Sequence, residues 1–412
     1  MSEVQDQAAI DPELSPEALT ERFGFDVLRD FDLDKPEFND QFQEVMDFVV
    51  QKCPVVHSPT GKGYTVFNTE EAVRTAGQDW QTFSSGKGYM HNRPENLPYL
   101  IPVEQDPPNQ SSWRHKLNPF MTIKVMESKA DLMRADTNLL IDRFIDHGHC
   151  EFVSEFAAIM PGWAFFKHNL GIPVDELDML VHNVELGLYA PMDERPGYFE
   201  KVFVYLDGFL KKRMELPPQG DIVDAILEGV TYKDGTPAPW DHKVSVAADL
   251  TFGGISTTIY AMGSSLFHLA THPDGLQLLL DRPDLIENAV EEFIRAYSPV
   301  VAMGRTCTRD TTLTGVDLKE GDFIMLGFAG ASRDPRAIEN PRDLNFKQPT
   351  IQHSTFGVGP HRCIGAHLAR VELRVFLEEW LRRIPSFRLK PGTEPSYETG
   401  FLRAMNSMHL EW

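Results

Sequence analysis

A glycine-rich loop runs into a predicted helix in the stretch His353-Ser-Thr-Phe356-Gly357-Val358-Gly359-Pro360-His361-Arg362-Cys363-Ile364-Gly365-Ala366-His367-Leu368-Ala369-Arg370. A buried stripe on that helix is predicted because apolar residues recur at helical spacing: Ile364, Leu368, Val371 and Val375. Pro385 is expected to end the helix. Cys363 therefore stands at a helix N-terminus, where unpaired N–H groups and the positive end of the helix dipole favour a thiolate over a thiol.

The chemistry of Cys363 has three explanations. A lone cysteine before a helix is most often a small buried hydrophobic residue. Zinc could be bound by His361, Cys363 and His367, although no second ligand cluster completes such a site. The third explanation rests on glycines that let a large flat group approach the backbone, namely Gly357, Gly359 and Gly365. A thiolate beneath a flat group indicates an axial ligand to haem iron, which favours O–O cleavage.

A resemblance to a known family rests on the whole pattern Phe356-Gly357-x-Gly359-x-His361-x-Cys363-x-Gly365, which is similar to the haem-binding signature of the cytochrome P450 superfamily. The resemblance covers nearly the whole chain. It is nearest to the soluble bacterial subgroup typified by camphor hydroxylase, on the residues Phe83-Ser-Ser85, Ile101-Pro102, Asp106-Pro-Pro-x-Gln110 and Arg362-Cys363.

The resemblance implies a mainly α fold with small β-sheets, shaped as a triangular prism with a long central helix over the haem. It also implies a haem-thiolate monooxygenase that uses O₂ and haem b. Cys363 is then the axial ligand of the iron, and Phe356, Gly357 and Gly365 belong to the haem-binding loop.

Length and composition fit one large folded unit. The chain has 412 residues, of which 42% are hydrophobic and 24% are charged, as is ordinary for globular proteins. It contains no Gly/Ser-rich or Pro-rich linker and no internal repeat, so a single domain over 1–412 is expected. A β-rich lobe should include roughly 50–68 and 300–328, and the remainder should form an α-rich lobe.

Charge and cysteine content bear on partners and location. The formal net charge of −22 argues against nucleic acid and anionic membranes as partners. The first 20 residues are acidic and polar, so we expect a loose arm with neither a signal peptide nor a membrane anchor. The four cysteines have no paired spacing and fit a reducing compartment. A cytoplasmic enzyme is therefore expected.

A second group of candidates follows a long irregular loop over 84–105. The helix predicted after this loop carries Gln110 and Arg114 on one face. Taken alone, such a pair is typical of a solvated surface. The resemblance implies instead that both bind a haem propionate, with Arg305 and His361 as further partners, although many relatives have His where Gln110 stands. Arginine suits this role because its guanidinium pairs bidentately with carboxylates.

An apolar stretch over 244–270 predicts a helix about 40 Å long. That length would suit a transmembrane span. Asp249, His268 and many Ser, Thr and Gly residues argue against a span, as does the lack of flanking basic clusters. A buried central helix is therefore preferred.

Gly253 and Gly254 weaken this predicted helix, because each glycine costs roughly 1 kcal/mol relative to alanine. Such a pair is typical of a close contact between helices, or it could leave a groove for dioxygen over the haem. Thr257 could donate a hydrogen bond to the Gly253 carbonyl four residues earlier and loosen the helix. The resemblance implies that these residues and Ser256 form the oxygen-activation motif of the family.

Ser256 departs from the family pattern, in which Asp or Glu precedes the threonine. A hydroxyl can pass a proton along but cannot supply one at neutral pH. Protons must then arrive through waters, through another acid, or more slowly. The departure keeps open a peroxide-driven or low-turnover thiolate-haem protein, or a haem-based ligand sensor, although a sensor would have no evident use for Thr257.

The substrate pocket implied by the resemblance has few polar anchors, and its lining is Tyr89, Leu100, Leu250, Gly254, Val300, Val301 and Phe401. This lining predicts a compact hydrophobic substrate, a terpenoid or norisoprenoid, with a substituted aromatic compound as the alternative. Camphor itself is not expected, because the position of the loop tyrosine that anchors a ketone in the camphor-type relative falls on Pro98, next to Tyr99.

Two further expectations follow from the resemblance. Glu292 and Arg295 match the structural ion pair of the family, with Arg342 as a third partner. Electrons should come from an iron–sulfur ferredoxin and its NAD(P)H-dependent reductase. An acidic ferredoxin would need a basic surface near the cysteine, for which the candidates are Arg74, Arg114, Lys116, Lys347, Arg362, Arg370 and Arg374, although any one of them alone is typical of an ordinary solvated surface.

Overall fold

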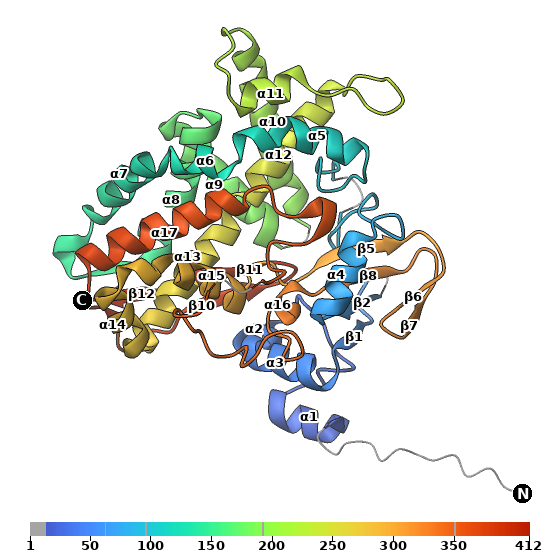
Figure 1. Ribbon diagram of the computed structural model, residues 1–412, viewed down its shortest axis with the longest axis vertical. Helices are drawn as coiled ribbons and strands as arrows, with labels where there is room; N and C mark the ends of the chain where they lie inside the picture. The colour runs from blue at the N-terminus through green and yellow to red at the C-terminus, as the bar shows by residue number, and fades with distance from the viewer. Residues whose placement is uncertain (1–13, 62, 95–96, 192, 350–351) are drawn as a thin grey trace, which may run out of the picture.

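The computed structural model describes residues 14–61, 63–94, 97–191, 193–349 and 352–412. Helices dominate, and Figure 1 shows most of them gathered on one side of the molecule with the largest sheet on the other. The prediction of a mainly α fold with small β-sheets is confirmed. Residues 1–13 of the expected acidic arm lie outside the described residues, and the end of that arm is helical, with Ser15 as N-cap of the first helix.

The α-helices are α1 (Pro16–Phe23), α2 (Pro36–Asp40), α3 (Phe42–Lys52), α4 (Glu70–Gln78), α5 (Asn109–Leu117), α6 (Ile123–Glu127), α7 (Ala130–Ile141), α8 (Met160–Gly162), α9 (Val174–Tyr189), α10 (Arg195–Met214), α11 (Ile222–Glu228), α12 (Trp240–Gly253), α13 (Ser256–Thr271), α14 (Pro273–Asp281), α15 (Ile286–Tyr297), α16 (Phe328–Ala331) and α17 (Ala366–Arg383). Two π-helical segments cover Val153–Ala157 and Trp163–Leu170. The strands are β1 (Val55–Ser58), β2 (Tyr64–Phe67), β3 (Phe83–Ser84), β4 (His149–Glu151), β5 (Met303–Cys307), β6 (Thr311–Leu313), β7 (Val316–Leu318), β8 (Phe323–Leu326), β9 (Arg388–Leu389), β10 (Ser396–Thr399), β11 (Arg403–Ser407) and β12 (His409–Glu411).

The largest sheet has the strand order β1-β2-β8-β5-β3. β1 and β2 form an antiparallel hairpin, in which Val55 lies opposite Phe67. β8 pairs in parallel with β2 and antiparallel with β5, so strands from 50–68 and 300–328 meet in one sheet. β5 begins at Met303. The small sheets β4-β12-β9 and β10-β11 lie outside both ranges.

The central helix predicted over 244–270 is two helices, α12 and α13, separated at Gly254 and Ile255. Gly254 closes α12, and Ile255 departs from ideal helical dihedral angles with φ −113° and ψ −76°. Two adjacent glycines make this the weakest point of the helix. Both helices are buried on most sides, as predicted, and the break lies beside the functional residues described below.

Helices α9 and α10 pack against each other, and α10 also packs against α12 (Figure 1). The rings of Phe199 on α10 and Phe252 on α12 lie 4.3 Å apart between centroids. This contact joins the helix pair to the central helix close to its break. Helices make up most of the described chain between residues 121 and 215.

Helix α17 carries the predicted apolar stripe, in which Leu368, Val371 and Val375 are buried. It packs against α7, α13 and α15. The helix begins at Ala366 and ends before Pro385, so Cys363 lies three residues ahead of its first turn. A short 3₁₀ turn, Gly359–His361, precedes the cysteine.

Glu292 and Arg295 form a buried bidentate ion pair, with 2.9 Å for each of its two N–H···O contacts. The expected third partner is wrong: Arg342 pairs with Asp47 at 2.9 Å. The remaining N–H groups of Arg295 donate to the backbone carbonyls of Ser332, Pro341 and Asp343 instead. A buried guanidinium needs every donor satisfied, and the neighbouring backbone does this without a second carboxylate.

We expect Arg295→Ala to lower the free energy of unfolding by about 3–5 kcal/mol, because Glu292 is left buried without its counter-charge. Chemical denaturation curves measure this loss. Arg342→Ala is the control: its side chain is 57% exposed, so the expected cost is below about 1 kcal/mol. Equal losses in the two variants would contradict the prediction.

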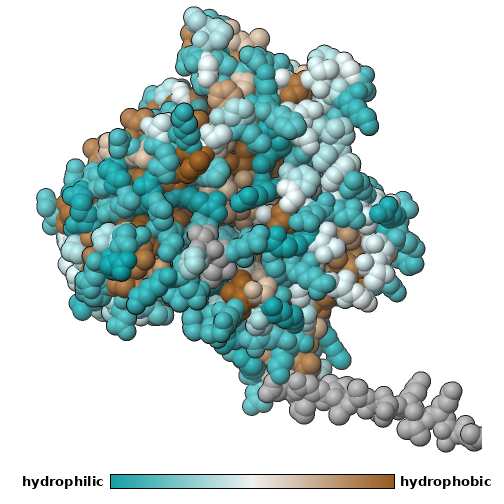
Figure 2. Space-filling model, viewed as in Figure 1, coloured by the Kyte–Doolittle hydropathy of each residue, from teal (hydrophilic) through white to brown (hydrophobic). Residues whose placement is uncertain are grey.

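Within the described residues, no helix combines the length and the apolarity that crossing a membrane requires. Figure 2 shows a largely hydrophilic face on which hydrophobic residues form small, scattered groups. The long apolar stretch of α12 and α13 is thus covered by the rest of the protein.

Candidate active site

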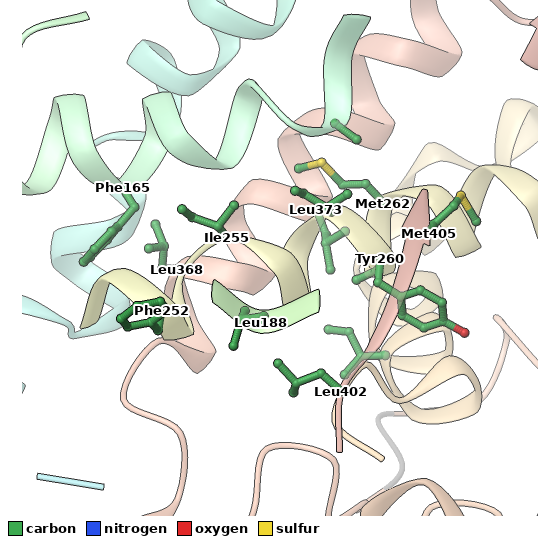
Figure 3. Close-up of a cluster of buried hydrophobic side chains, with 14 of the residues drawn as sticks. Phe165, Leu188, Phe252, Ile255, Tyr260, Met262, Leu368, Leu373, Leu402 and Met405 are labelled. Atoms are coloured by element: carbon green, nitrogen blue, oxygen red, sulfur yellow. The ribbon is translucent and has the colours of Figure 1, made fainter. Parts of the chain in front are cut away.

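A cavity lies between the break in the central helices and the loop that precedes α17. Its lining includes Gly253, Gly254 and Thr257 from the region of the break, and Phe356 and Cys363 from the loop. Apolar side chains from separate elements add to the walls, and Figure 3 shows four of them, Phe165, Leu188, Phe252 and Leu402. Segments more than 100 residues apart in sequence therefore meet around one space with a thiol on its wall.

The cysteine loop is shaped by two glycines with positive φ, Gly357 at +71° and Gly359 at +68°. A Cβ at Gly359 would overlap the carbonyl oxygen of Gly77 on α4, so this glycine is needed for packing against α4 rather than for a flat ligand. Gly365 differs, because a Cβ there would stand 3.7 Å from the Cys363 sulfur. The loop is closed by a hydrogen bond of 2.7 Å from the Cys363 N–H to the Phe356 carbonyl.

The Cys363 sulfur is reached from the cavity but otherwise surrounded by protein. Burial raises the pKa of the Cys363 thiol, and the Gly365 N–H, Arg114 and Arg370 only partly offset this. The expectation of a thiolate favoured by the helix N-terminus is therefore wrong for the protein alone, because desolvation outweighs the dipole. A metal cation at the sulfur would reverse the balance, since a coordinating thiol loses its proton.

Cationic and donor side chains gather at one edge of the cavity: Arg114, Arg305 and His361. Arg305 is buried and its guanidinium donates to the Gly304 carbonyl at 2.6 Å. Burial lowers the pKa of Arg305 to about 10, which still leaves it charged at neutral pH. Burial, Arg305 and Arg114 lower the pKa of His361 to about 3, so its ring is neutral.

This donor set fits the carboxylates of haem. Among the described residues, neither Arg114 nor Arg305 has an ion-pair partner, and His361 Nε2 is buried with no hydrogen-bond partner. Buried cations without counter-charges are costly, so the site is suited to a ligand that brings anions. A flat group carrying two propionates, with its metal at Cys363, would satisfy both ends of the cavity.

Gln110, the other expected propionate partner, is already engaged. It lies on α5 one turn before Arg114, as predicted, and lines the cavity. Its Nε2 donates to the Pro360 carbonyl at 2.7 Å, and its Oε1 accepts from Ser111. Gln110 therefore ties α5 to the cysteine loop.

The two glycines of the pair differ in what surrounds them. A Cβ at Gly254 would lie 3.2 Å from Phe165, so Gly254 allows a close contact with the π-helical segment. A Cβ at Gly253 would meet nothing within 4 Å, so Gly253 borders open space. The predicted hydrogen bond from the Thr257 hydroxyl to the Gly253 carbonyl is present at 3.2 Å.

Ser256 does not line the cavity. Its side chain is buried and its hydroxyl donates to Glu185 on α9, a residue that the sequence analysis did not single out. No sequence signal joins positions 71 apart, so this contact depends on the packing of α9.

Two other acids were missed, Asp249 and Glu372, both of which line the cavity. Burial and Glu104 raise the pKa of Asp249 to about 7, against the lowering effects of Arg114 and the Val103 N–H. Burial also holds the pKa of Glu372 well above its usual range. The available signal was a carboxylate on an otherwise apolar helix face.

The expected substrate contacts divide into two groups. Tyr89, Leu250, Val300 and Phe401 line the cavity, and the Tyr89 and Phe401 rings meet edge to face at 5.6 Å. Leu100 and Val301 are buried in the core and are not part of the cavity wall, so those two assignments are wrong. Val301 follows Val300 in extended chain, where adjacent side chains point to opposite sides.

Tyr99 does not enter the cavity either. Its side chain is 49% exposed, and the Arg93 guanidinium lies over its ring at 4.2 Å. The structure thus provides no tyrosine anchor at this position, in agreement with the expectation that camphor is not the substrate.

A helical fold that brings a cysteine and an unpaired set of donors to one large cavity defines a cysteine-ligated haem protein. Comparison with known proteins gives the family. A family model described as Cytochrome P450 matches residues 279–410. A "Probable cytochrome P450 127A1" of Sinorhizobium fredii (strain NBRC 101917 / NGR234) is 30% identical over 368 residues, which covers 87% of each chain.

A "Steroid C26-monooxygenase" of Mycolicibacterium smegmatis (strain ATCC 700084 / mc(2)155) is 32% identical over 343 residues, covering 79% of this chain and 82% of the relative. The crystal structure of CYP101J2 has a TM-score of 0.82 at 29% identity, covering 93% of this chain and 96% of that chain. The structure of CYP101C1 also has a TM-score of 0.82, at 28% identity, covering 94% and 97%. The chain belongs to the cytochrome P450 family, and it is a monooxygenase.

Proposed function

We propose that the protein uses haem b and O₂ to insert one oxygen atom into a compact hydrophobic substrate, a terpenoid or norisoprenoid. The observation that carries this proposal is the cavity itself, whose lining includes Cys363 and Thr257 and otherwise consists mainly of apolar residues. Relatives named for steroid and vitamin D(3) oxidation act on bulky apolar molecules, which supports a hydrophobic substrate. A substituted aromatic compound is the alternative.

In this proposal Cys363 binds the iron, and Arg114, Arg305 and His361 hold the propionates. Bound haem supplies the binding and reductive splitting of O₂. Gly253 borders open space, and the Thr257 hydroxyl, which donates to the Gly253 carbonyl, would hold and pass protons in the cavity. The apolar walls exclude water and position the substrate through shape.

The substrate class is tested by titrating the purified holoprotein with β-ionone, with a substituted benzoate and with camphor, and by following the shift of the haem absorption band as iron-bound water is displaced. The proposal expects the norisoprenoid to give the largest shift at the lowest concentration. Tighter binding of the benzoate would move the assignment to the aromatic alternative.

The monooxygenase, the peroxide-driven enzyme and the ligand sensor differ in whether they use O₂ with electrons from NADH, hydrogen peroxide, or no oxidant. We expect NADH to be consumed with a ferredoxin and its reductase when the substrate is present, and hydrogen peroxide alone to give little product. Efficient turnover with peroxide alone would indicate the peroxide-driven alternative, and no turnover with either would indicate a ligand sensor.

The proposed ferredoxin surface is smaller than the sequence suggests. Arg114 lies in the cavity, and four other candidates form ion pairs: Arg74 with Glu70, Lys116 with Glu228, Arg370 with Glu291 and Arg374 with Glu127. Arg362 and Lys347 are exposed and have no ion-pair partner among the described residues. Of these two, Arg362 adjoins Cys363 in sequence and is therefore the better candidate for contact with an acidic partner near the cysteine.

Arg362→Ala is expected to weaken reduction by ferredoxin roughly two- to fivefold at low ionic strength, the value of an exposed ion pair, and the difference should vanish at high salt. Stopped-flow reduction at several salt concentrations measures it. Lys319→Ala is the control, because this 73% exposed lysine lies beyond β7 and pairs with Asp310. A salt-independent defect, or an equal defect in the control, would contradict the proposed surface.

A further inference from the structure

The residue before Thr257 is a serine, Ser256, and the carboxylate of Glu185 contacts its side chain. Ser256 begins α13 immediately after the helix break, and its hydroxyl donates to the Glu185 carboxylate. Glu185 belongs to α9, a different helix, which ends four residues later at Tyr189. The carboxylate beside Ser256 therefore comes from α9 and not from the central helix.

The two side chains differ in their access to water. Ser256 is only 2% exposed, whereas Glu185 has intermediate exposure although protein surrounds most of it. Glu185 is therefore the more accessible residue of the pair. This is the order that a relay from solvent to cavity requires.

The surroundings of Glu185 raise its pKa to a value at which the carboxyl group can both release and take up a proton near neutral pH. Burial raises the pKa of Glu185 to about 7, and the Ser256 hydroxyl only partly lowers it. The other ionisable group beside it is Tyr189, which is partly buried. Its side chain lies close to Ser256, Glu398 and Arg195, and its hydroxyl has no hydrogen-bond partner among the described residues. At neutral pH both the acid and the carboxylate of Glu185 are accessible, as a proton donor requires.

The path from Ser256 to the cavity runs through the helix break. Successive residues on a helix point about 100° apart, so Ser256 faces α9 while Thr257 lines the cavity. The Thr257 hydroxyl donates to the Gly253 carbonyl, and Gly253 borders open space. A relay from Ser256 to Thr257 would then require a bridging water between these two adjacent hydroxyl groups.

We propose that Glu185 is the proton donor of this enzyme and acts through Ser256 and Thr257, in place of the carboxylate that precedes the threonine in other family members. Oxidation of a substrate R–H consumes protons and electrons according to R–H + O₂ + 2 e⁻ + 2 H⁺ → R–OH + H₂O. The electrons come from NAD(P)H through the ferredoxin. Glu185 gives its O–H proton to the Ser256 oxygen, Ser256 releases its own hydroxyl proton toward Thr257, and solvent reprotonates Glu185. The inference rests on the proposed monooxygenase function.

The first test needs no turnover. Infrared difference spectra between wild type and Glu185→Gln isolate the C=O band of the protonated Glu185 carboxyl. We expect this band to disappear between mildly acidic and mildly alkaline pH with a midpoint of about 7, and to shift in Ser256→Ala, which removes its hydrogen-bond donor. A Glu185 that is fully ionised at neutral pH, or a band unaffected by Ser256→Ala, would overturn the relay.

The second test measures coupling in the holoenzyme with ferredoxin, its reductase, NADH and β-ionone. Glu185→Gln retains an oxygen that accepts from Ser256, so α9 stays in place while the acid is lost. We expect product per NADH to fall roughly ten- to a hundredfold, the low end of what general acid catalysis contributes, with an unchanged Kd for β-ionone. The double variant Glu185→Gln with Ser256→Asp should recover most of the coupling, because it returns an acid to α13.

The control is Asp178→Asn, an exposed carboxylate on the same helix, which should behave as wild type. If Glu185→Gln keeps its coupling, or if product yield and substrate affinity fall together without recovery in the double variant, Glu185 is only a contact that holds α9. If wild type itself does not oxidise β-ionone, the substrate proposal fails, and the infrared test still decides the state of Glu185.

Discussion

Purified Cys363→Ala protein is expected to contain essentially no haem. Cys363 is the one cysteine on the described cavity wall, and Arg114 and Arg305 can bind propionates but cannot hold iron. The reduced protein exposed to carbon monoxide should therefore lack the red-shifted absorption band that wild type displays through sulfur ligation. Absorption spectra and iron content per chain measure both effects.

The matched control is Cys53→Ala, which removes a half-buried cysteine whose sulfur donates to the Val55 carbonyl, away from the cavity. We expect it to bind haem as wild type does. Retention of the red-shifted band in Cys363→Ala, or its absence from wild type, would refute the assignment of the axial ligand and the function built on it.

Thr257→Ala should divert most electrons from product into hydrogen peroxide. The Thr257 hydroxyl, which donates to the Gly253 carbonyl, is the group expected to pass protons in the cavity. Without it, O₂ can leave as H₂O₂ after taking up two electrons and two protons. We expect product per NADH to fall roughly tenfold or more, while NADH consumption falls less. Product and peroxide are quantified in the same reaction.

Two variants separate the loss of the Thr257 hydroxyl from the loss of a side-chain hydrogen bond to the helix backbone. Thr257→Ser keeps the hydroxyl and should keep most of the coupling. Thr271→Ala removes an equivalent bond to the carbonyl four residues earlier, Phe267, at the far end of α13, and should have no effect on coupling. Equal uncoupling by Thr271→Ala would mean that the helix, and not the cavity hydroxyl, was disturbed.

Local spacing alone determined much of this protein. The loop around Cys363, the apolar stripe of α17, the shared helix face of Gln110 and Arg114, and the bond from Thr257 to Gly253 all follow from residues within a few turns of one another. The signature around Cys363 also identified the family, and with it the mainly helical fold.

Tertiary packing decided what those residues contact. Gln110 meets Pro360 from 250 positions away, and Ser256 meets Glu185 on a helix 71 positions earlier. Gly359 is required because a side chain there would overlap the backbone of α4, and Arg342 forms an ion pair with Asp47. Burial reversed the expected pKa shift of Cys363. Sequence periodicity reports which face of an element is buried, but the partner across that face and the loss of water around a charge arise only when distant elements pack together.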